Sequence, residues 1–194
     1  WDTGIAFGTV AGKRGDTTVE VTTYRTENYD PDSRKPEVEY GDSIDGDLSR
    51  RDFTVNSMAL ELTGEKPEFI DPFNGLQDLA AKILRTPVRP GESFNDDPLR
   101  MMRAARFASQ LNFEIAPEVL SSMKDLAHRI SIISAERVRD EFTKIMMSVN
   151  PRIGITLLVD SGLADIVLPE IPKLRLEVDE HHHHKDVYEH SITV

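Results

Sequence analysis

Residues 96–107 read DDPLRMMRAARF, and this stretch decides the fold of the second half of the chain. From Met101 onward, apolar side chains recur at intervals of three and four residues, which is typical of a helix with one buried face. Asp97 is a typical helix N-cap, and Pro98 suits the first helical position. The stretch therefore predicts an amphipathic helix that opens at Asp97 and Pro98. Its expected buried positions are Met101, Ala104, Ala105, Ala108 and Leu111.

Three arginines, Arg100, Arg103 and Arg106, follow the same helix start at intervals of three residues. Such residues turn by about 60° per step and form a slanting basic stripe. The positive end of the helix and three guanidinium groups would suit the oxygens of a triphosphate or an RNA backbone.

Asp97 and Arg100 are one helical turn apart, so an acceptor and a planar donor could jointly meet the edge of a base. An alternative remains open, because an Asp at this position is often only a cap and an Arg three residues later its surface ion partner. The spacing alone does not choose between these interpretations.

Three further helices are expected downstream, at residues 117–130, 135–149 and 151–161. Ser134 is the expected cap of the second, and Gly162 is the expected stop of the third. Helical spacing predicts the buried face of the second helix. That face comprises Val138, Phe142, Ile145 and Val149.

The first half of the chain has the pattern of strands and turns. Ile5–Val10 and Thr17–Tyr24 read as strands joined by the loop AGKRGD, and residues 71–75, DPFNG, read as a turn. A polar loop is expected at 25–47 and an apolar-rich element of uncertain type at 53–62. Strands followed by helices predict an α+β fold, in which a small sheet-bearing head leads into an all-helical second part with a boundary near residue 90.

Composition narrows the function classes. The 194 residues include no cysteine, which excludes disulfide scaffolds, Cys zinc sites and thiol nucleophiles. The apolar runs are far shorter than a membrane span requires. The net charge of −11 divides into −9 over residues 1–81 (8 basic, 17 acidic), +3 over 82–152 (12 and 9) and −5 over 153–194 (3 and 8). The locally basic middle permits a nucleotide or one RNA strand as ligand.

Other charged residues have simple alternatives beside any function. Glu20 lies on the less apolar face of its expected strand and reads equally as an exposed strand residue. Arg50 and Arg51 could form a solvated surface. Asp45-Gly46-Asp47 matches Asp-x-Asp as a string but lies in an expected loop. The four consecutive histidines at 181–184 indicate either a metal-binding segment or a purification tag.

Taken together, four stretches resemble the tRNA nucleotidyltransferase and bacterial poly(A) polymerase family, which includes the class II CCA-adding enzymes. They are VEVTTYR at 19–25, RRDFTVNSMA at 50–59, DPFNG at 71–75 and DDPLRMMRAARF at 96–107, and SAERVRDEFTKIM at 134–146 agrees with them. The resemblance implies the C-terminal part of a nucleotidyltransferase head at 1–90, a helical neck and body that binds RNA and nucleotide at 91–175, and the start of a possible HD-type domain at 176–194.

The resemblance also implies an enzyme activity. It is the template-independent addition of C and A to tRNA 3′ ends from CTP and ATP, with Mg²⁺, in the cytoplasm and without a membrane. Asp97 and Arg100 look like the pair that hydrogen-bonds the incoming base. Arg51, Arg103 and Arg106 look like ligands of the sugar and triphosphate, and Asn56 is a further candidate for the sugar.

The metal site implied by the resemblance is incomplete in this sequence. Glu20 resembles the third carboxylate of the family's sheet and is the candidate catalytic residue and metal ligand. The family's Gly-rich loop and Asp-x-Asp pair would precede Ile5, so we expect a fragment that by itself binds nucleotide poorly and catalyses nothing. Asp96 stands where the family usually has Glu, and His190 resembles a first ligand of an HD-type metal site.

Three alternatives remain at this point. The nearest is a poly(A) polymerase of the same family, which needs the same donor and acceptor layout. The second is a non-catalytic RNA- or nucleotide-binding module. The third is an HD-type phosphohydrolase whose site includes the His-rich end.

Overall fold

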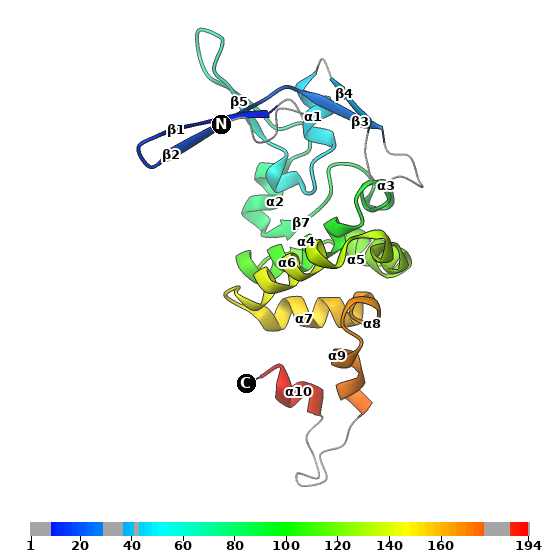
Figure 1. The fold of residues 1–194 in the computed structure, drawn as a ribbon. Helices are drawn as coiled ribbons and strands as arrows, with labels where there is room; N and C mark the ends of the chain where they lie inside the picture. Colours follow the sequence, from blue (N-terminus) through cyan, green and yellow to red (C-terminus); the bar gives the residue numbers. More distant parts are fainter. Residues whose placement is uncertain (1–8, 29–36, 41–42, 177–186, 194) are drawn as a thin grey trace.

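A computed structural model describes residues 9–28, 37–40, 43–176 and 187–193. Most strands gather at one end of the molecule, and the helices of the second half stack away from them toward the C-terminus (Figure 1). The strands are β1 Thr9–Arg14, β2 Thr17–Thr22, β3 Arg25–Asn28, β4 Glu37–Tyr40, β5 Ala59–Glu61, β6 Glu68–Ile70, β7 Ile83–Leu84 and β8 Glu114–Ile115. The α-helices are α1 Ile44–Ser49, α2 Gly75–Ala81, α3 Pro90–Asp96, α4 Leu99–Leu111, α5 Pro117–Leu126, α6 Ala135–Met146, α7 Pro151–Asp160, α8 Leu163–Val167, α9 Glu170–Lys173 and α10 Val187–Ser191. Short 3-10 helices occupy Thr54–Asn56, Ala127–Ile132 and Leu174–Leu176.

The expected α+β class is confirmed. In the described residues the strands form four two-stranded sheets, of which β1–β2, β3–β4 and β5–β6 are antiparallel and β7–β8 is parallel. None of the helices in the described part of the chain is long and apolar enough to cross a membrane.

The first hairpin is longer than the sequence pattern indicated. The expected loop at 11–16 is wrong, because β1 continues to Arg14 and only Gly15 and Asp16 form the turn. Gly15 has a φ of 59°, which glycine adopts without strain, so a two-residue connection is available. The strands then pair from Thr9 opposite Thr22 to Arg14 opposite Thr17. The part of the expected first strand before Thr9 lies outside the described residues.

The expected polar loop at 25–47 is also corrected. It contains β3, β4 and the start of α1, for which Ser43 is the N-cap and accepts a hydrogen bond from Gly46 N. The uncertain element at 53–62 consists of a 3-10 turn followed by β5. The turn at 71–75 is confirmed, since the Asp71 carboxylate accepts hydrogen bonds from Gly75 N and Leu76 N and so caps α2.

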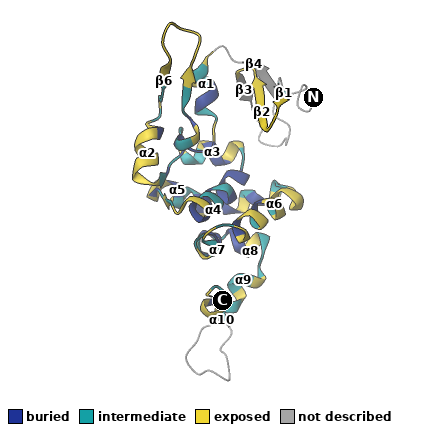
Figure 2. Ribbon diagram, turned by 90° about the vertical axis from the view of Figure 1, so that its left-hand side faces the viewer, coloured by how far each residue is buried: buried dark blue, intermediate teal, exposed yellow. Residues whose placement is uncertain are grey.

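Helix α4 is the centre of the core, which the burial colouring of Figure 2 shows as dark blue along this helix. Met101, Ala104, Ala105 and Ala108 are fully buried as expected, whereas Leu111 at the last position is 45% exposed. A Cβ on Gly154 of α7 would lie 2.4 Å from Ser109 Oγ and 2.6 Å from Ile145 Cγ2. Small side chains therefore let α4, α6 and α7 approach closely.

The other expected helices are present with shorter bounds. Helix α5 gives way to a 3-10 helix at Ala127, and α6 ends at Met146. Ile145 is fully buried, but Val149 lies beyond the helix end and is 89% exposed, so its expected place on the buried face is wrong. Gly162 has a φ of 80° and stops α7 as expected.

Helix α3 was not expected, and neither were the short helices α1, α2, α8, α9 and α10. Pro90-Gly91 reads as a break, yet Pro90 is in the first turn of α3, a position where a missing backbone N–H has no cost. The core cluster extends from Phe53 and Leu84 through α4 to Leu163 and Tyr188. The division of the chain near residue 90 stays a prediction.

Candidate functional site

A cleft of about 450 Å³ opens between the segment after α1 and the start of α4. Its lining is polar and rich in charged side chains. The lining residues are Arg50, Arg51, Asp52, Asn56, Asp97, Arg100 and Arg103. Five of the six residues that the sequence assigns to nucleotide binding, separated by up to 52 positions in the chain, therefore line the same cleft.

Asp97 sits at the turn between α3 and α4 in an extended conformation. Its Oδ1 accepts a hydrogen bond from Leu99 N at 3.1 Å and so satisfies the first N–H of α4, although the helix begins at Leu99 with Pro98 at the N-cap position, one residue later than expected. Its Oδ2 accepts from Arg137 Nη2 of α6 at 3.2 Å. A carboxylate has about four lone-pair positions, so capping and contact with a ligand are compatible.

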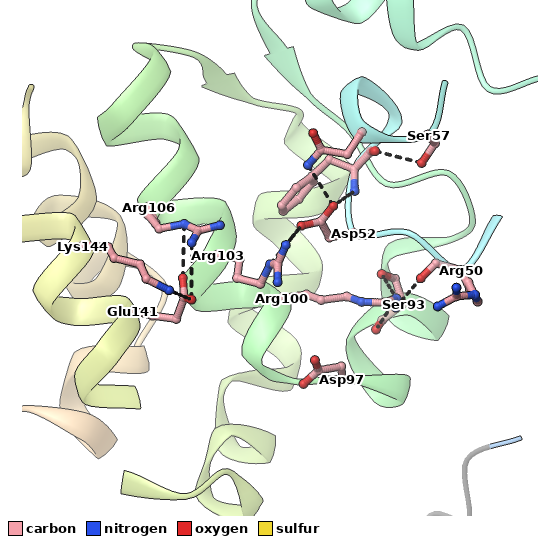
Figure 3. A network of polar contacts seen from close by, with 12 residues as sticks. Arg50, Asp52, Ser57, Ser93, Asp97, Arg100, Arg103, Arg106, Glu141 and Lys144 are labelled. Carbon is pink, nitrogen blue, oxygen red and sulfur yellow. Dashed lines mark hydrogen bonds and ion pairs between the residues drawn. The ribbon is translucent and has the colours of Figure 1, made fainter. Parts of the chain in front are cut away.

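Arg100 is buried, and three acceptors fix its guanidinium, two at Nη1 and one at Nη2. Nη1 donates to Ser93 Oγ at 2.9 Å and to Ser93 O at 3.3 Å, while Nη2 donates to the carbonyl oxygen of Arg50. Figure 3 shows this side chain extended from α4 toward Ser93 and Arg50. The first arginine of the helix is thus held in place before any ligand arrives.

Asp52 is the acidic centre of the cleft and is only 7% exposed. Its Oδ1 accepts from Phe53 N at 2.9 Å and Asn56 Nδ2 at 3.0 Å. Its Oδ2 accepts from Nε and Nη2 of Arg103 at 2.9 and 2.5 Å. This single carboxylate therefore orients two of the predicted sugar and triphosphate ligands, Asn56 and Arg103.

Arg51 is held from the other side by Asp47. Asp47 Oδ2 accepts from Arg51 Nη2 at 2.8 Å, and Asp47 Oδ1 accepts from Arg50 Nη2 at 2.5 Å. Burial alone would raise the pKa of Asp47, but the hydrogen bonds from Arg51 and Arg50 hold the pKa below its usual value. Asp45 and Asp47 lie in the first turn of α1 and not in a loop, and this pairing uses Asp47 as a partner of arginines.

Arg106 lies apart from the cleft. Its Nε is 3.2 Å from Glu141 Oε2 in α6, and its guanidinium stacks over the Phe107 ring at 4.2 Å. Burial lowers the pKa of Arg106, and the charge of Glu141 opposes that shift. The three arginines of α4 therefore have different protein partners (Figure 3): Arg100 contacts Ser93 and Arg50, Arg103 contacts Asp52, and Arg106 contacts Glu141. The triphosphate role of Arg106 stays a prediction that no described contact supports.

The two candidate metal ligands are separate from this cleft. Glu20 is exposed on β2, opposite Ala11 of β1, and His190 is exposed on α10. Within the described residues no group of three or more His, Asp or Glu side chains could hold a metal ion. His181 to His184 fall outside the described residues.

Several residues of the site were not assigned by sequence reasoning. Asp52 was quoted only as part of a motif, although its place between the expected ligands Arg51 and Asn56 was a usable signal. No local sequence pattern marks Ser93 or Glu141 as part of the site, because each contacts an arginine of another helix. Ser93 of α3 contacts Arg100, and Glu141 of α6 contacts Arg106, both in α4.

Comparison with known proteins identifies two family models along the chain. Residues 1–85 match a model described as the poly A polymerase head domain, and residues 112–174 match one described as a probable RNA- and SrmB-binding site of polymerase A. A CCA-adding enzyme of Streptococcus gordonii is 41% identical over 92% of this chain and 44% of its own length. One from Lactobacillus helveticus is 40% identical over 86% of this chain and 41% of its own length.

Solved structures agree with the sequence matches. The Bacillus stearothermophilus CCA-adding enzyme in complex with CTP has a TM-score of 0.73 and 34% identity, over 84% of this chain and 38% of that one. A tRNA nucleotidyltransferase complexed with a primer tRNA and an incoming ATP analog has a TM-score of 0.69 and 26% identity, over 97% and 56%. The chain spans less than half the length of the curated relatives that it matches.

Proposed function

The chain belongs to the tRNA nucleotidyltransferase and poly(A) polymerase family, and on that premise we propose that its natural protein adds C and A to tRNA 3′ ends from CTP and ATP without a template. One observation supports the proposal most: the cleft at the start of α4 presents a carboxylate and a fixed guanidinium side by side, among further arginines. The CTP complex of a structural relative supports the choice of ligand.

The chemistry of the bases explains why this pair would select C and A. Cytosine and adenine each carry an exocyclic amine, which donates, beside a ring nitrogen, which accepts. Uracil and guanine carry a carbonyl oxygen and a ring N–H in the same places. In the proposal the Asp97 carboxylate accepts from the amine and the Arg100 guanidinium donates to the ring nitrogen, so uracil and guanine would face two mismatched contacts.

The remaining arginines of the cleft suit the rest of the nucleotide. Arg51 is about half exposed and Arg103 is 36% exposed, so both have N–H groups that a ligand can reach. Guanidinium groups bind phosphate oxygens through paired hydrogen bonds. We assign Arg51 and Arg103 to the sugar and triphosphate, with Asn56 beside them toward the sugar. No described contact supports the same assignment for Arg106.

Mg²⁺ is part of the proposal for the natural protein, since the transfer of a nucleotidyl group to a hydroxyl is assisted by metal ions in this chemistry. Glu20 is the proposed ligand and catalytic residue of this chain. The described residues supply no complete ligand set, so no step is assigned to a metal ion here. The described residues place no metal-holding cluster around His190, so no observation favours the HD-type hydrolase over the transferase. A cytoplasmic location and the tRNA 3′ end as macromolecular partner complete the proposal.

The test is incubation of the complete natural protein with a tRNA that lacks its terminal CCA, with labelled CTP or ATP given separately and together. Addition of two C residues and then one A supports the proposal. A long A tail that forms without CTP would instead indicate poly(A) synthesis. Tight binding of RNA or nucleotide with no addition would identify a non-catalytic binding module.

Asp97→Ala separates base selection from capping. Loss of a cap costs about 1 kcal/mol of unfolding free energy. Loss of a base contact costs about 1 to 3 kcal/mol of discrimination, or roughly 5- to 150-fold. We expect the ratio of kcat/KM for CTP over UTP to fall within that range. Asp71→Ala is the matched control, because Asp71 caps α2 outside the cleft.

The control should lose similar stability and keep its preference for CTP. If Asp97→Ala also keeps that preference, while its unfolding free energy falls as in the control, then Asp97 is a cap and not a reader of the base.

A further inference from the structure

Ser93 is completely buried in α3 and is not among the residues that line the cleft. Its side chain nevertheless contacts the cleft indirectly, since its Oγ accepts a hydrogen bond from Arg100 Nη1 at 2.9 Å. The Ser93 carbonyl oxygen accepts from the same nitrogen at 3.3 Å and also from Asp97 N at 3.2 Å. One residue therefore contacts both members of the proposed base-reading pair.

These contacts restrict the orientation of Arg100. A guanidinium group has five N–H donors in one rigid plane. The two hydrogens of Nη1 are directed at Ser93, and one hydrogen of Nη2 is directed at the carbonyl oxygen of Arg50. Among the described residues, Nε and the second hydrogen of Nη2 have no hydrogen-bond partner, so these two donors remain for a ligand.

We propose that Ser93 is a positioning residue for nucleotide selection: its hydroxyl group fixes the plane of the Arg100 guanidinium, and thereby decides which donors meet the edge of the base. The inference rests on the proposed function, which supplies Arg100 with its base. Ser93 itself touches no nucleotide in this arrangement and acts only through Arg100.

The position of Ser93 explains why its effect should fall on selection and not on general affinity. The sugar and triphosphate ligands, Arg51 and Arg103, are held by Asp47 and Asp52, and neither carboxylate has a hydrogen bond to Ser93 among the described residues. Loss of the Ser93 hydroxyl therefore leaves those arginines in place. Without the hydroxyl group, the Arg100 guanidinium can rotate about its remaining contacts with the carbonyl oxygens of Ser93 and Arg50. Arg100 then discriminates less well between cytosine, whose ring nitrogen accepts a hydrogen bond, and uracil, whose ring N–H cannot.

The first test is Ser93→Ala in the complete natural protein, assayed with tRNA lacking CCA and with CTP, ATP or UTP. One hydrogen bond is worth roughly 2- to 12-fold in an equilibrium constant. We expect the kcat/KM ratio of CTP over UTP to fall by about 3- to 10-fold, mainly through a higher KM for CTP. Ser109→Ala is the matched control, since Ser109 is also fully buried and its hydroxyl group donates to Ala105 O in α4, away from the cleft.

The second test is a double-mutant cycle with Arg100→Ala. If Ser93 acts through Arg100, then Ser93→Ala lowers selectivity no further once Arg100 is absent. A purely structural role predicts an unchanged CTP preference in Ser93→Ala, or an equal loss with and without Arg100, and either result overturns the proposal. Should Ser93→Ala fail to fold, Ser93→Cys keeps the size of the side chain with a poorer acceptor, and the same cycle applies.

Equilibrium binding of CTP and UTP separates this inference from the proposed function. If the natural protein binds CTP but adds no nucleotide to tRNA, then the proposed activity is wrong. The Ser93 inference is still decided by the CTP over UTP binding ratio in Ser93→Ala. A ratio equal to that of the unmodified protein contradicts the inference even when CCA addition is confirmed.

Discussion

Asp52→Ala is expected to lower the free energy of unfolding by about 3 kcal/mol and to abolish tight binding of CTP. The substitution removes a hydrogen-bonded charge pair with Arg103 and leaves the N–H of the fully buried Phe53 without its acceptor. A hydrogen bond to a charged group is worth roughly 1.5 to 3 kcal/mol, and an unsatisfied buried N–H costs about 1 to 3 kcal/mol. Urea unfolding and CTP titration measure the two effects.

Asp52→Asn provides the comparison that assigns the loss. Asparagine retains an oxygen that can accept from Phe53 N but carries no charge for Arg103. It should recover part of the stability and little of the affinity for CTP. Wild-type affinity in Asp52→Ala would show that Arg103 and Asn56 need no orientation from this carboxylate.

Glu141→Ala is expected to be the most destabilising change outside the cleft, at about 3 to 5 kcal/mol of unfolding free energy. Arg106 is only 11% exposed, and Glu141 at 6% exposed is its ion partner. Removal of one member of a buried pair leaves an uncompensated charge, which accounts for that magnitude. The midpoint of a urea transition, analysed with an unchanged slope, gives the measurement.

Lys144→Ala is the matched control for this change. Lys144 also pairs with Glu141, at 3.1 Å, but it is 48% exposed, so its loss should cost no more than about 1 kcal/mol. Joint replacement of Arg106 and Glu141 by Met and Leu should restore most of the stability, because no buried charge then remains. A Glu141→Ala protein as stable as Lys144→Ala would contradict the account of this pair.

The sequence predicted α4 well because its signals are local. Asp97, Pro98 and the alanine spacing act within a few residues of one another. The structure confirms the buried alanine face and places the helix start within one residue of the prediction, with Asp97 accepting from Leu99 N. The resemblance also selected residues that the structure brings to one cleft. In these cases the physical cause of the structure is contained in a short stretch of chain.

The errors have causes that a short stretch does not contain. Helix α3 was missed because Pro90 reads as a break unless it is recognised as the first turn of a helix. The stripe expected from Arg100, Arg103 and Arg106 is divided among partners on three other segments, which helical spacing cannot indicate. Val149 was placed on a buried face because the end of α6 depends on its packing and not on apolar period alone.

The proposed function requires Asp97 and Arg100, at the start of α4, to hydrogen-bond the incoming base as a template base would. The most direct measurement is a structure of the complete natural protein with CTP bound and a second with ATP bound. The account predicts that the amine of each base donates to Asp97, while Arg100, still held by Ser93, donates to the adjacent ring nitrogen. A base bound elsewhere, with Asp97 engaged only by Leu99 N and Arg137 and with Arg100 donating only to Ser93 and Arg50, would contradict it.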